Sequence, residues 1–171
     1  MLDILRRRRS IRRYKDREIE AVIIEQLKEA ALRSPSSRAI NPWRFLFITD
    51  KARLEALSRA KESGSGFLKG ARLGVVVCAK DDESDVWIED CSIASIILQL
   101  TGQSLGLGSC WIQIRKRMHS DRQSAEDYVK EVHHLPENIR VESMIAFGYP
   151  DENKPPVPKE ELDYEKIILS R

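Results

Sequence analysis

A run of basic residues near the start of the chain, RRRRSIRRYKDR at positions 6–17, is the first stretch whose side chains could do chemistry. It carries eight basic residues and one acid, Asp16, although the whole chain has a formal net charge of only +2. Because like charges repel, the run needs a counter-charge. It could be a solvated basic surface, a nucleic-acid-binding arm, or a pocket for one small phosphate, which the planar guanidinium fork of arginine suits.

The composition of the chain bears on these three interpretations. The 29 basic and 27 acidic residues give no global attraction to nucleic acid, and no aromatic stacking platform lies near the run. Ser10 and Ile11 interrupt the run, and a core-forming helix follows it, which argues against a purely solvated surface. The residues alone leave the three interpretations open.

Cysteines and histidines offer less chemistry. The odd count of cysteines, without a CxxC pair, predicts a reduced, cytoplasmic protein; they are Cys78, Cys91 and Cys110. Cys110 follows a Gly-Ser turn, yet without a nearby histidine we interpret it as a small buried apolar residue rather than a redox nucleophile. The histidines have no metal-ligand spacing, so no metal site is expected; they are His119, His133 and His134. We expect no signal peptide and no membrane span.

The elements that must position these residues follow from periodicity and breakers. Helices are predicted at 1–8, from an N-cap at Asp16 to before Pro35, and at 51–60, 86–105 and 120–133. Strands are predicted at 43–50, 73–80, 107–114 and 141–150. Mixed helices and strands around one core predict a single α+β domain over residues 1–171. No GxGxxG or GxxxxGK[ST] pattern supports a Rossmann or P-loop site.

Two segments point beyond a single chain. The helix at 86–105 has little polar face, so it is expected to be buried nearly all round or against a partner chain. Residues 151–171 form a tail with three prolines in four positions and a short apolar run, Ile167 to Leu169. Because such a chain stays extended, we expect this tail to pack on another subunit.

Four motifs occur in order: RRSIRRY near the start, SPSSRAINPWRF after the first long helix, GLGSCWIQ after the apolar helix, and AFGYP near the end. Together they resemble the nitroreductase family of FMN-dependent oxidoreductases, in its compact form, over almost the whole chain. The resemblance implies an α+β sandwich with a mostly antiparallel sheet flanked by helices. It also implies an intertwined homodimer with FMN at the interface.

The resemblance further implies which residues bind FMN. The first motif supplies the phosphate and ring contacts, the second lines the flavin from the other subunit, and the third packs against the ring. On this sequence the candidates are Arg8, Arg9, Ser10, Arg12, Pro35, Ser36, Ser37, Asn41, Trp111, Ile112 and Gln113, with Lys154 as the nearest basic residue after the last strand. Asn41 stands where glutamine is more usual in the family, and Ala39 where asparagine is common.

The implied activity is ping-pong hydride transfer from NADH or NADPH through FMN N5 to a small electrophile, such as a nitroaromatic, a quinone or an enone. No catalytic side chain is expected, because the flavin carries the chemistry. The alternative is a non-catalytic flavin-binding or flavin-sequestering protein on the same fold. The sequence identifies neither the physiological acceptor nor the preferred nicotinamide donor.

Overall fold

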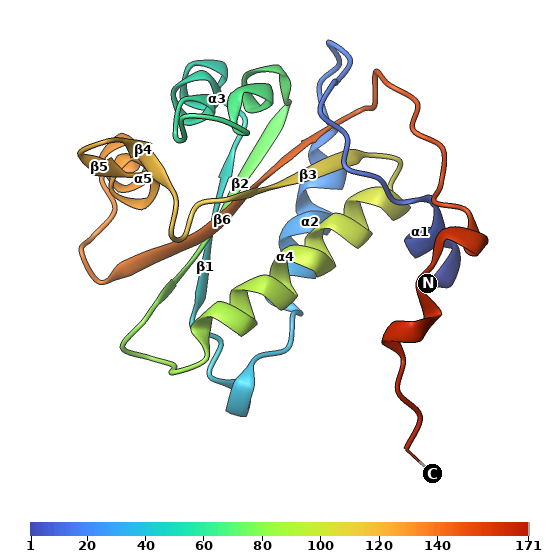
Figure 1. Cartoon of the computed structure of the whole chain (residues 1–171). Coiled ribbons are helices and arrows are strands. Elements are labelled where there is room, and N and C mark those ends of the chain that lie inside the picture. Colours follow the sequence, from blue (N-terminus) through green and yellow to red (C-terminus); the bar gives the residue numbers. More distant parts are fainter. Residues whose placement is uncertain (171) are drawn as a thin grey trace.

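A four-stranded sheet forms the centre of the computed structural model, which describes residues 1–170 (Figure 1). Its strands are β1 (Trp43–Ile48), β2 (Leu73–Lys80), β6 (Ile139–Gly148) and β3 (Gly108–Gln113), in that order, and all neighbours are antiparallel. The central strand β2 is a continuous apolar run, and β6 is buried along nearly its whole length, as expected for strands covered on both faces. The predicted α+β class with a mostly antiparallel sheet is therefore confirmed.

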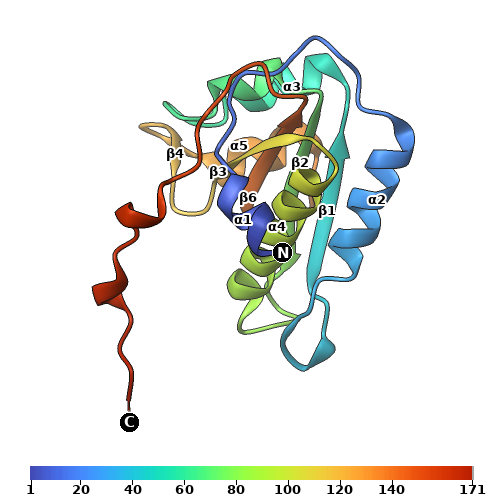
Figure 2. The same cartoon turned by 90° about the vertical axis from the view of Figure 1, so that its right-hand side faces the viewer.

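Helices cover both faces of the sheet (Figure 2). On one face, α3 (Lys51–Ser58) and α5 (Ala125–His133) pack on side chains that include Val76 and Met144. On the other face, α2 (Ala21–Leu32) and α4 (Trp87–Ser104) pack on side chains that include Val75 and Phe147. A short helix, α1 (Leu2–Arg7), lies against α4. The alternating faces of the strands thus divide the core into two clusters.

The start of α2 differs from the prediction. The helix begins at Ala21, with Glu20 as its N-cap, rather than after Asp16. Asp16 instead forms an ion pair with Arg72. The backbone just before it is held extended, because the N–H of Lys15 donates to the carbonyl of Tyr149 at 2.8 Å. A long-range contact therefore outweighs the local capping signal.

The helix α5 also begins later in the structure than the sequence predicts. Residues expected in a helix from 120 form a hairpin of β4 (Met118–Ser120) and β5 (Gln123–Ser124), and the helix begins at Ala125. Its cap is Ser124, whose hydroxyl accepts a hydrogen bond from the N–H of Asp127 at 3.0 Å. The inward face is as predicted, with Val129 buried in the core.

The apolar helix α4 is not buried all round within one chain. Its inner face is buried, but Ile93 and Ile96 on the outer face remain 40% and 39% exposed. Of the two expectations for this helix, burial within the single chain is wrong.

The tail follows the last strand and projects from the body of the protein (Figures 1 and 2). It contains two single-turn 3-10 segments, Lys159–Glu161 and Tyr164–Lys166, and exposes apolar side chains that include Ile167, Ile168 and Leu169. Arg171, the last residue of the predicted tail, lies outside the described residues. No helix within residues 1–170 is long and apolar enough to cross a membrane.

Candidate functional site

Residues 8–14, which we call the arginine arm, cross the ends of β3 and β6. Ser10 bridges Ser109 in parallel, and the N–H of Ile11 donates to the Ser109 carbonyl at 3.0 Å. Glycine is required where the arm crosses, because a Cβ at Gly108 would lie 2.8 Å from Ile11. At Gly148 it would likewise lie 2.8 Å from Tyr14. The arm is thus fixed to the sheet by backbone contacts, which do not depend on its arginine side chains.

The arginines of the basic run fall into two groups. Arg6 pairs with Asp3 at 3.1 Å, and Arg17 pairs with Glu20 at 2.7 Å. Within residues 1–170, by contrast, no carboxylate forms an ion pair with the three arginines that the resemblance selects; these are Arg8, Arg9 and Arg12. The counter-charge for these three is therefore not supplied by the described chain.

Lys154 reaches the arginine arm from the start of the tail. Its ammonium group donates to the Ser10 carbonyl at 2.6 Å and pairs with Glu152 at 3.2 Å. Glu152 in turn accepts from the backbone N–H groups of Arg12 at 2.5 Å and Arg13 at 3.2 Å. These bonds, led by that from Arg12, lower the pKa of Glu152. The structure therefore brings Lys154 to the first motif across more than a hundred residues of sequence.

The pKa of the Cys110 thiol depends on the charges around the start of β3. Burial raises the pKa of its thiol, while the charges of Arg12, Lys154 and Arg8 act in the opposite direction. All three cations therefore lie near the same thiol. Because Cys110 is only 2% exposed and its pKa is raised, it behaves as a buried apolar residue, as the sequence indicated. Arg12 also stacks over the ring of Phe67, with 5.7 Å to the centroid.

The strand β3 presents an open edge to the arm. The carbonyl of Ser109 faces the arm, and the N–H of Ile114 faces inward, donating to the Glu142 carbonyl at 3.1 Å. Since backbone groups alternate along a strand, the N–H groups of Trp111 and Gln113 point to the open edge. The backbone N–H groups of Trp111 and Gln113 can therefore donate to a ligand at this edge, whereas the N–H group of Ile114 cannot.

Side chains of the third motif divide between the two faces. The half-buried Trp111 donates from Nε1 to Oε1 of Gln113 at 3.0 Å, and Nε2 of Gln113 lies 3.3 Å from Oε1 of Glu142. This relay fixes the orientation of the Gln113 amide. The Ile112 side chain lies in the core on the α3 and α5 face and is 1% exposed.

The second motif forms a strained loop. Three residues without a glycine's freedom have positive φ, namely Arg38 at 53°, Ala39 at 55° and Asn41 at 56°. Asn41 is tied to Ser36, whose hydroxyl lies 2.8 Å both from its amide oxygen and from its backbone N–H. The N–H of Ser37 donates to the buried carboxylate of Asp90 at 2.8 Å, while Pro35 is exposed.

The structure does not bring the first and second motifs together within one chain. The second-motif loop is bound to Asp90 in the first turn of α4, whereas the arginine arm bridges Ser109, beyond the other end of that helix (Figure 1). A helix of 18 residues is about 27 Å long. A site that uses both motifs must therefore take them from two chains.

Three carboxylates that shape this site were not found by sequence analysis: Asp90, Glu142 and Glu152. Asp90 lies in an apolar helix beside Glu89, and Glu142 lies in a largely apolar strand; an acid within such a run was the available signal. Glu152 follows the last strand in an acidic loop, where nothing distinguishes it from its neighbours.

The antiparallel sheet covered by helices and the arginine arm are the features to compare with known proteins. The model of the Nitroreductase family matches residues 5–64 and 52–149. The chain therefore belongs to the nitroreductase family, and it is an oxidoreductase.

Similar proteins agree with this assignment. A solved structure of an FMN-dependent nitroreductase from Clostridium difficile R20291 is 42% identical, with a TM-score of 0.98 over 100% of this chain and 99% of that one. An Archaeoglobus fulgidus protein named "Putative NADH dehydrogenase/NAD(P)H nitroreductase" is 36% identical over 90% of this chain and 87% of its own length. A protein of the same name from Methanothermobacter thermautotrophicus is 32% identical over 100% of this chain and 87% of its own length.

Proposed function

We propose that this protein is an FMN-dependent oxidoreductase that takes a hydride from NADH or NADPH and passes electrons to a small electrophile, such as a nitroaromatic, a quinone or an enone. The observation that carries the proposal is the arginine arm, whose Arg8, Arg9 and Arg12 have no carboxylate partner within the described chain. We place the activity in the cytoplasm, since the three cysteines are free.

The residues present fit the phosphate of FMN. A phosphate monoester is a dianion near neutral pH, and it matches guanidinium groups that can each offer two N–H donors. Arg8 and Arg12, with the Ser10 hydroxyl between them, would hold the phosphate, and Lys154 adds a further cation beside Ser10. Arg9 already donates to the carbonyl of Pro155, so it also ties the arm to the tail.

The open edge of β3 fits the ring of the flavin. Bound FMN supplies the redox chemistry, because its N5 accepts the hydride from the nicotinamide and its reduced ring then delivers electrons to the acceptor. The N–H groups of Trp111 and Gln113 provide donors along this edge, with Ile112 between them. The nearby arginine charge would stabilise negative charge on a bound flavin. No side chain is required as a general acid or base.

A homodimer completes the site in this proposal. The second-motif loop, with Pro35, Ser36, Ser37 and Asn41, would line the flavin from the partner subunit, since one chain holds it about a helix length from the arm. The exposed Ile93 and Ile96 of α4 give the dimer an apolar face. Obligate interfaces of this kind bury on the order of 2,000–5,000 Å².

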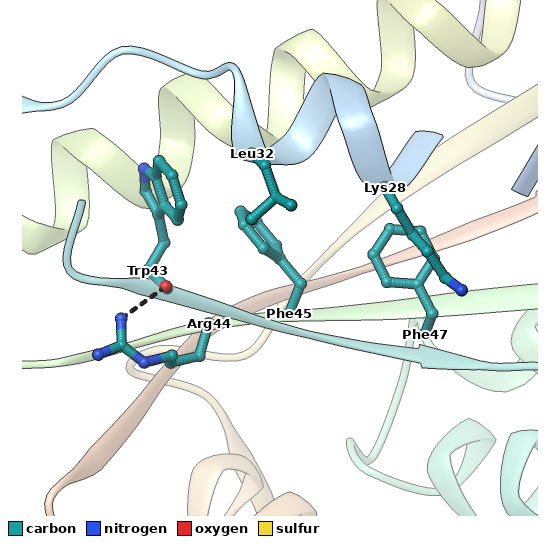
Figure 3. Close-up of a pocket in the computed structure, with 6 residues that line it drawn as sticks. All are labelled: Lys28, Leu32, Trp43, Arg44, Phe45 and Phe47. Carbon is teal, nitrogen blue, oxygen red and sulfur yellow. Dashed lines mark hydrogen bonds between the residues drawn. The ribbon is translucent and has the colours of Figure 1, made fainter. Parts of the chain in front are cut away.

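We further propose that the partner's tail docks beside β1. This strand is an edge of the sheet, and a groove lies between it and α2, lined by Lys28, Leu32, Trp43, Arg44, Phe45 and Phe47 (Figure 3). Phe45 and Phe47 point toward α2, Trp43 lies farther along β1, and the buried Nε1 of Trp43 has no hydrogen-bond partner within residues 1–170.

The tail has the chemistry to fill this groove. It carries exposed Ile167, Ile168 and Leu169, which match the apolar lining of the groove by Leu32, Phe45 and Phe47. A chain's own tail leaves the body on the side away from α2 and β1 (Figure 2). The occupant we propose is therefore the tail of the second subunit, added along the β1 edge.

The alternative function is flavin binding without turnover. Addition of NADH or NADPH to the FMN-loaded protein without oxygen distinguishes the two. Rapid loss of the flavin absorbance near 450 nm, followed by its recovery on addition of a quinone, is the result expected of an oxidoreductase. A flavin that stays oxidised with both donors would support sequestration instead.

The phosphate assignment is tested with three flavins and two salt concentrations. We expect riboflavin to bind much more weakly than FMN, because the two differ only in the phosphate. FAD should also bind less well, because its phosphate is esterified. Salt should weaken FMN binding only modestly, since the contacts are few and partly buried, whereas a polyanion site would lose orders of magnitude. Equal calorimetric affinities for riboflavin and FMN would show that the arginine arm does not bind the phosphate.

A further inference from the structure

A second cationic site lies between the loop that follows α3 and the turn that follows β3. A cavity of about 340 Å³ is present there, which we call the basic pocket. Its lining residues come from two short segments: Lys61, Glu62, Ser63, Lys116, Arg117 and Met118. None of them belongs to the arginine arm or to the other motifs of the flavin site.

The charges of the basic pocket are not neutralised by the chain. Three bases face one acid, and within residues 1–170 no carboxylate forms an ion pair with any of the three bases. Lys61 and Arg117 line the same cavity, and burial and then the charge of Arg117 lower the pKa of Lys61. Like charges kept close without a counter-charge are typical of anion sites.

The backbone holds the cations in this arrangement. Lys116 has a φ of 57°, in the left-handed region that a lysine adopts at a cost. Hydrogen bonds fix the turn on both sides, since the N–H of Arg115 donates to the Glu142 carbonyl at 3.0 Å. The N–H of Arg117 donates to the Ile114 carbonyl, also at 3.0 Å. The backbone of Lys116 and Arg117 is therefore fixed, and their side chains are exposed beside the cavity.

The basic pocket adjoins the proposed flavin site. Lys116 follows Gln113 on the open edge of β3 by three residues, and Cys110 on the same strand lies within electrostatic range of Lys61. If the flavin ring lies along the β3 edge, a nicotinamide stacked on the ring leaves the rest of its dinucleotide away from the arginine arm. The pocket is the cationic surface next to that position.

We propose that the basic pocket binds the 2′-phosphate of NADPH and makes NADPH the preferred donor, an inference that rests on the proposed function. A phosphate monoester carries about −1.5 to −2 charges at pH 7, which matches three bases against one acid. NADH has only a hydroxyl at this position. Arginine is a known partner of the 2′-phosphate in other dinucleotide sites.

The test combines a binding measurement with kinetics. Lys116→Ala and Arg117→Ala are compared with Arg122→Ala, which removes a charge from the exposed turn between β4 and β5, outside the pocket. Calorimetry on the FMN-loaded protein measures adenosine 2′,5′-bisphosphate against adenosine 5′-monophosphate. We expect each pocket variant to weaken the bisphosphate roughly tenfold or more, and to lower the NADPH-to-NADH ratio of kcat/KM by a similar factor. Arg122→Ala should change neither.

Several outcomes would overturn the proposal. Equal losses for NADH and NADPH would assign the pocket to the shared pyrophosphate. A weaker response to 4-nitrobenzoate as acceptor, with an unchanged donor ratio, would assign the anion to the acceptor. An unaltered bisphosphate affinity in both variants would mean that the pocket binds neither. Flavin that neither donor reduces would contradict the proposed function itself, and the calorimetry would still decide whether the pocket binds a phosphate monoester.

Discussion

At the scale of single residues, neighbours in sequence have different partners. Arg6 and Arg17 are neutralised by Asp3 and Glu20, whereas Arg8 and Arg12 are not. The motif selected Arg8 and Arg12 as phosphate ligands, but their lack of a carboxylate partner depends on which acids the fold brings near. The hydrogen bond from Lys154 to the Ser10 carbonyl likewise depends on the fold, because it requires the end of β6 to lie beside the arm.

The first prediction concerns these arginines. Arg8→Ala and Arg12→Ala should each weaken FMN binding by about 1.5–3 kcal/mol, roughly ten- to more than hundredfold, because each removes a charge-assisted contact to the phosphate. Arg6→Ala and Arg17→Ala are the matched controls and should leave the affinity close to that of the parent protein. Titration of apo-protein with FMN measures all four. Equal losses in the four variants would indicate a diffuse basic surface.

Glu142 provides a prediction on pH. It is 4% exposed, its Oε2 has no hydrogen-bond partner within residues 1–170, and burial raises its pKa above the ordinary carboxyl value. The folded protein therefore binds this proton more tightly than the unfolded chain does. The resulting stability is fully present below the unfolded pKa and is lost as the pH rises through the raised folded pKa.

Glu142→Gln should therefore gain stability relative to the parent as the pH rises across that window, and the difference should become constant above it. Thermal unfolding of both proteins at intervals between pH 4 and pH 8 measures this difference. Glu126→Gln, at a carboxylate paired with Arg140 at 2.7 Å, serves as a control and should lose stability instead. A pH-independent difference for Glu142→Gln would contradict the assignment.

At the scale of elements, strands were predicted more reliably than helix starts. The buried strand β2 is a continuous apolar run, and it has the predicted ends at Leu73 and Lys80. Helix starts depend on which of several caps is used. Asp16 and Ser120 are both good caps in isolation. In the structure, however, Asp16 forms an ion pair with Arg72, and Ser120 lies in the β4–β5 hairpin. These are tertiary contacts, which a local pattern does not contain.

The outer face of α4 gives the element-scale prediction. A carboxylate at Ile93 would be tolerated on a free surface, but it would be buried without a partner in an apolar interface. Ile93→Glu should therefore dissociate the dimer, and FMN affinity should fall with it, because the partner's second motif is lost. Ala52→Glu on the exposed face of α3 is the control. Light scattering and FMN titration measure both effects, and a dimer unchanged by Ile93→Glu would place the interface elsewhere.

At the scale of the whole molecule, the described chain has features that one chain does not satisfy. The groove beside β1 contains an unpartnered indole N–H, α4 exposes two isoleucines, and the tail exposes three consecutive apolar residues. The sequence predicted the helix and the tail as signs of a partner, because apolar surface without cover is costly in water. It could not predict the groove, which requires Lys28 and Phe47 to be neighbours across two elements.

The last prediction tests whether the tail is covered. Ile168 is 92% exposed in the single chain, so Ile168→Asp should cost little if the chain acts alone, since exposed substitutions are usually within about 0.5 kcal/mol. If the tail fills the partner's β1 groove, the same change buries a charge, weakens the dimer and makes the unfolding temperature fall more steeply on dilution. Lys159→Asp, on the polar part of the tail, is the control, and deletion of residues 155–171 should reproduce the effect of Ile168→Asp. Calorimetric scans at several protein concentrations measure this. An Ile168→Asp protein with the parent's unfolding temperature at every concentration would show that the tail is free in solution.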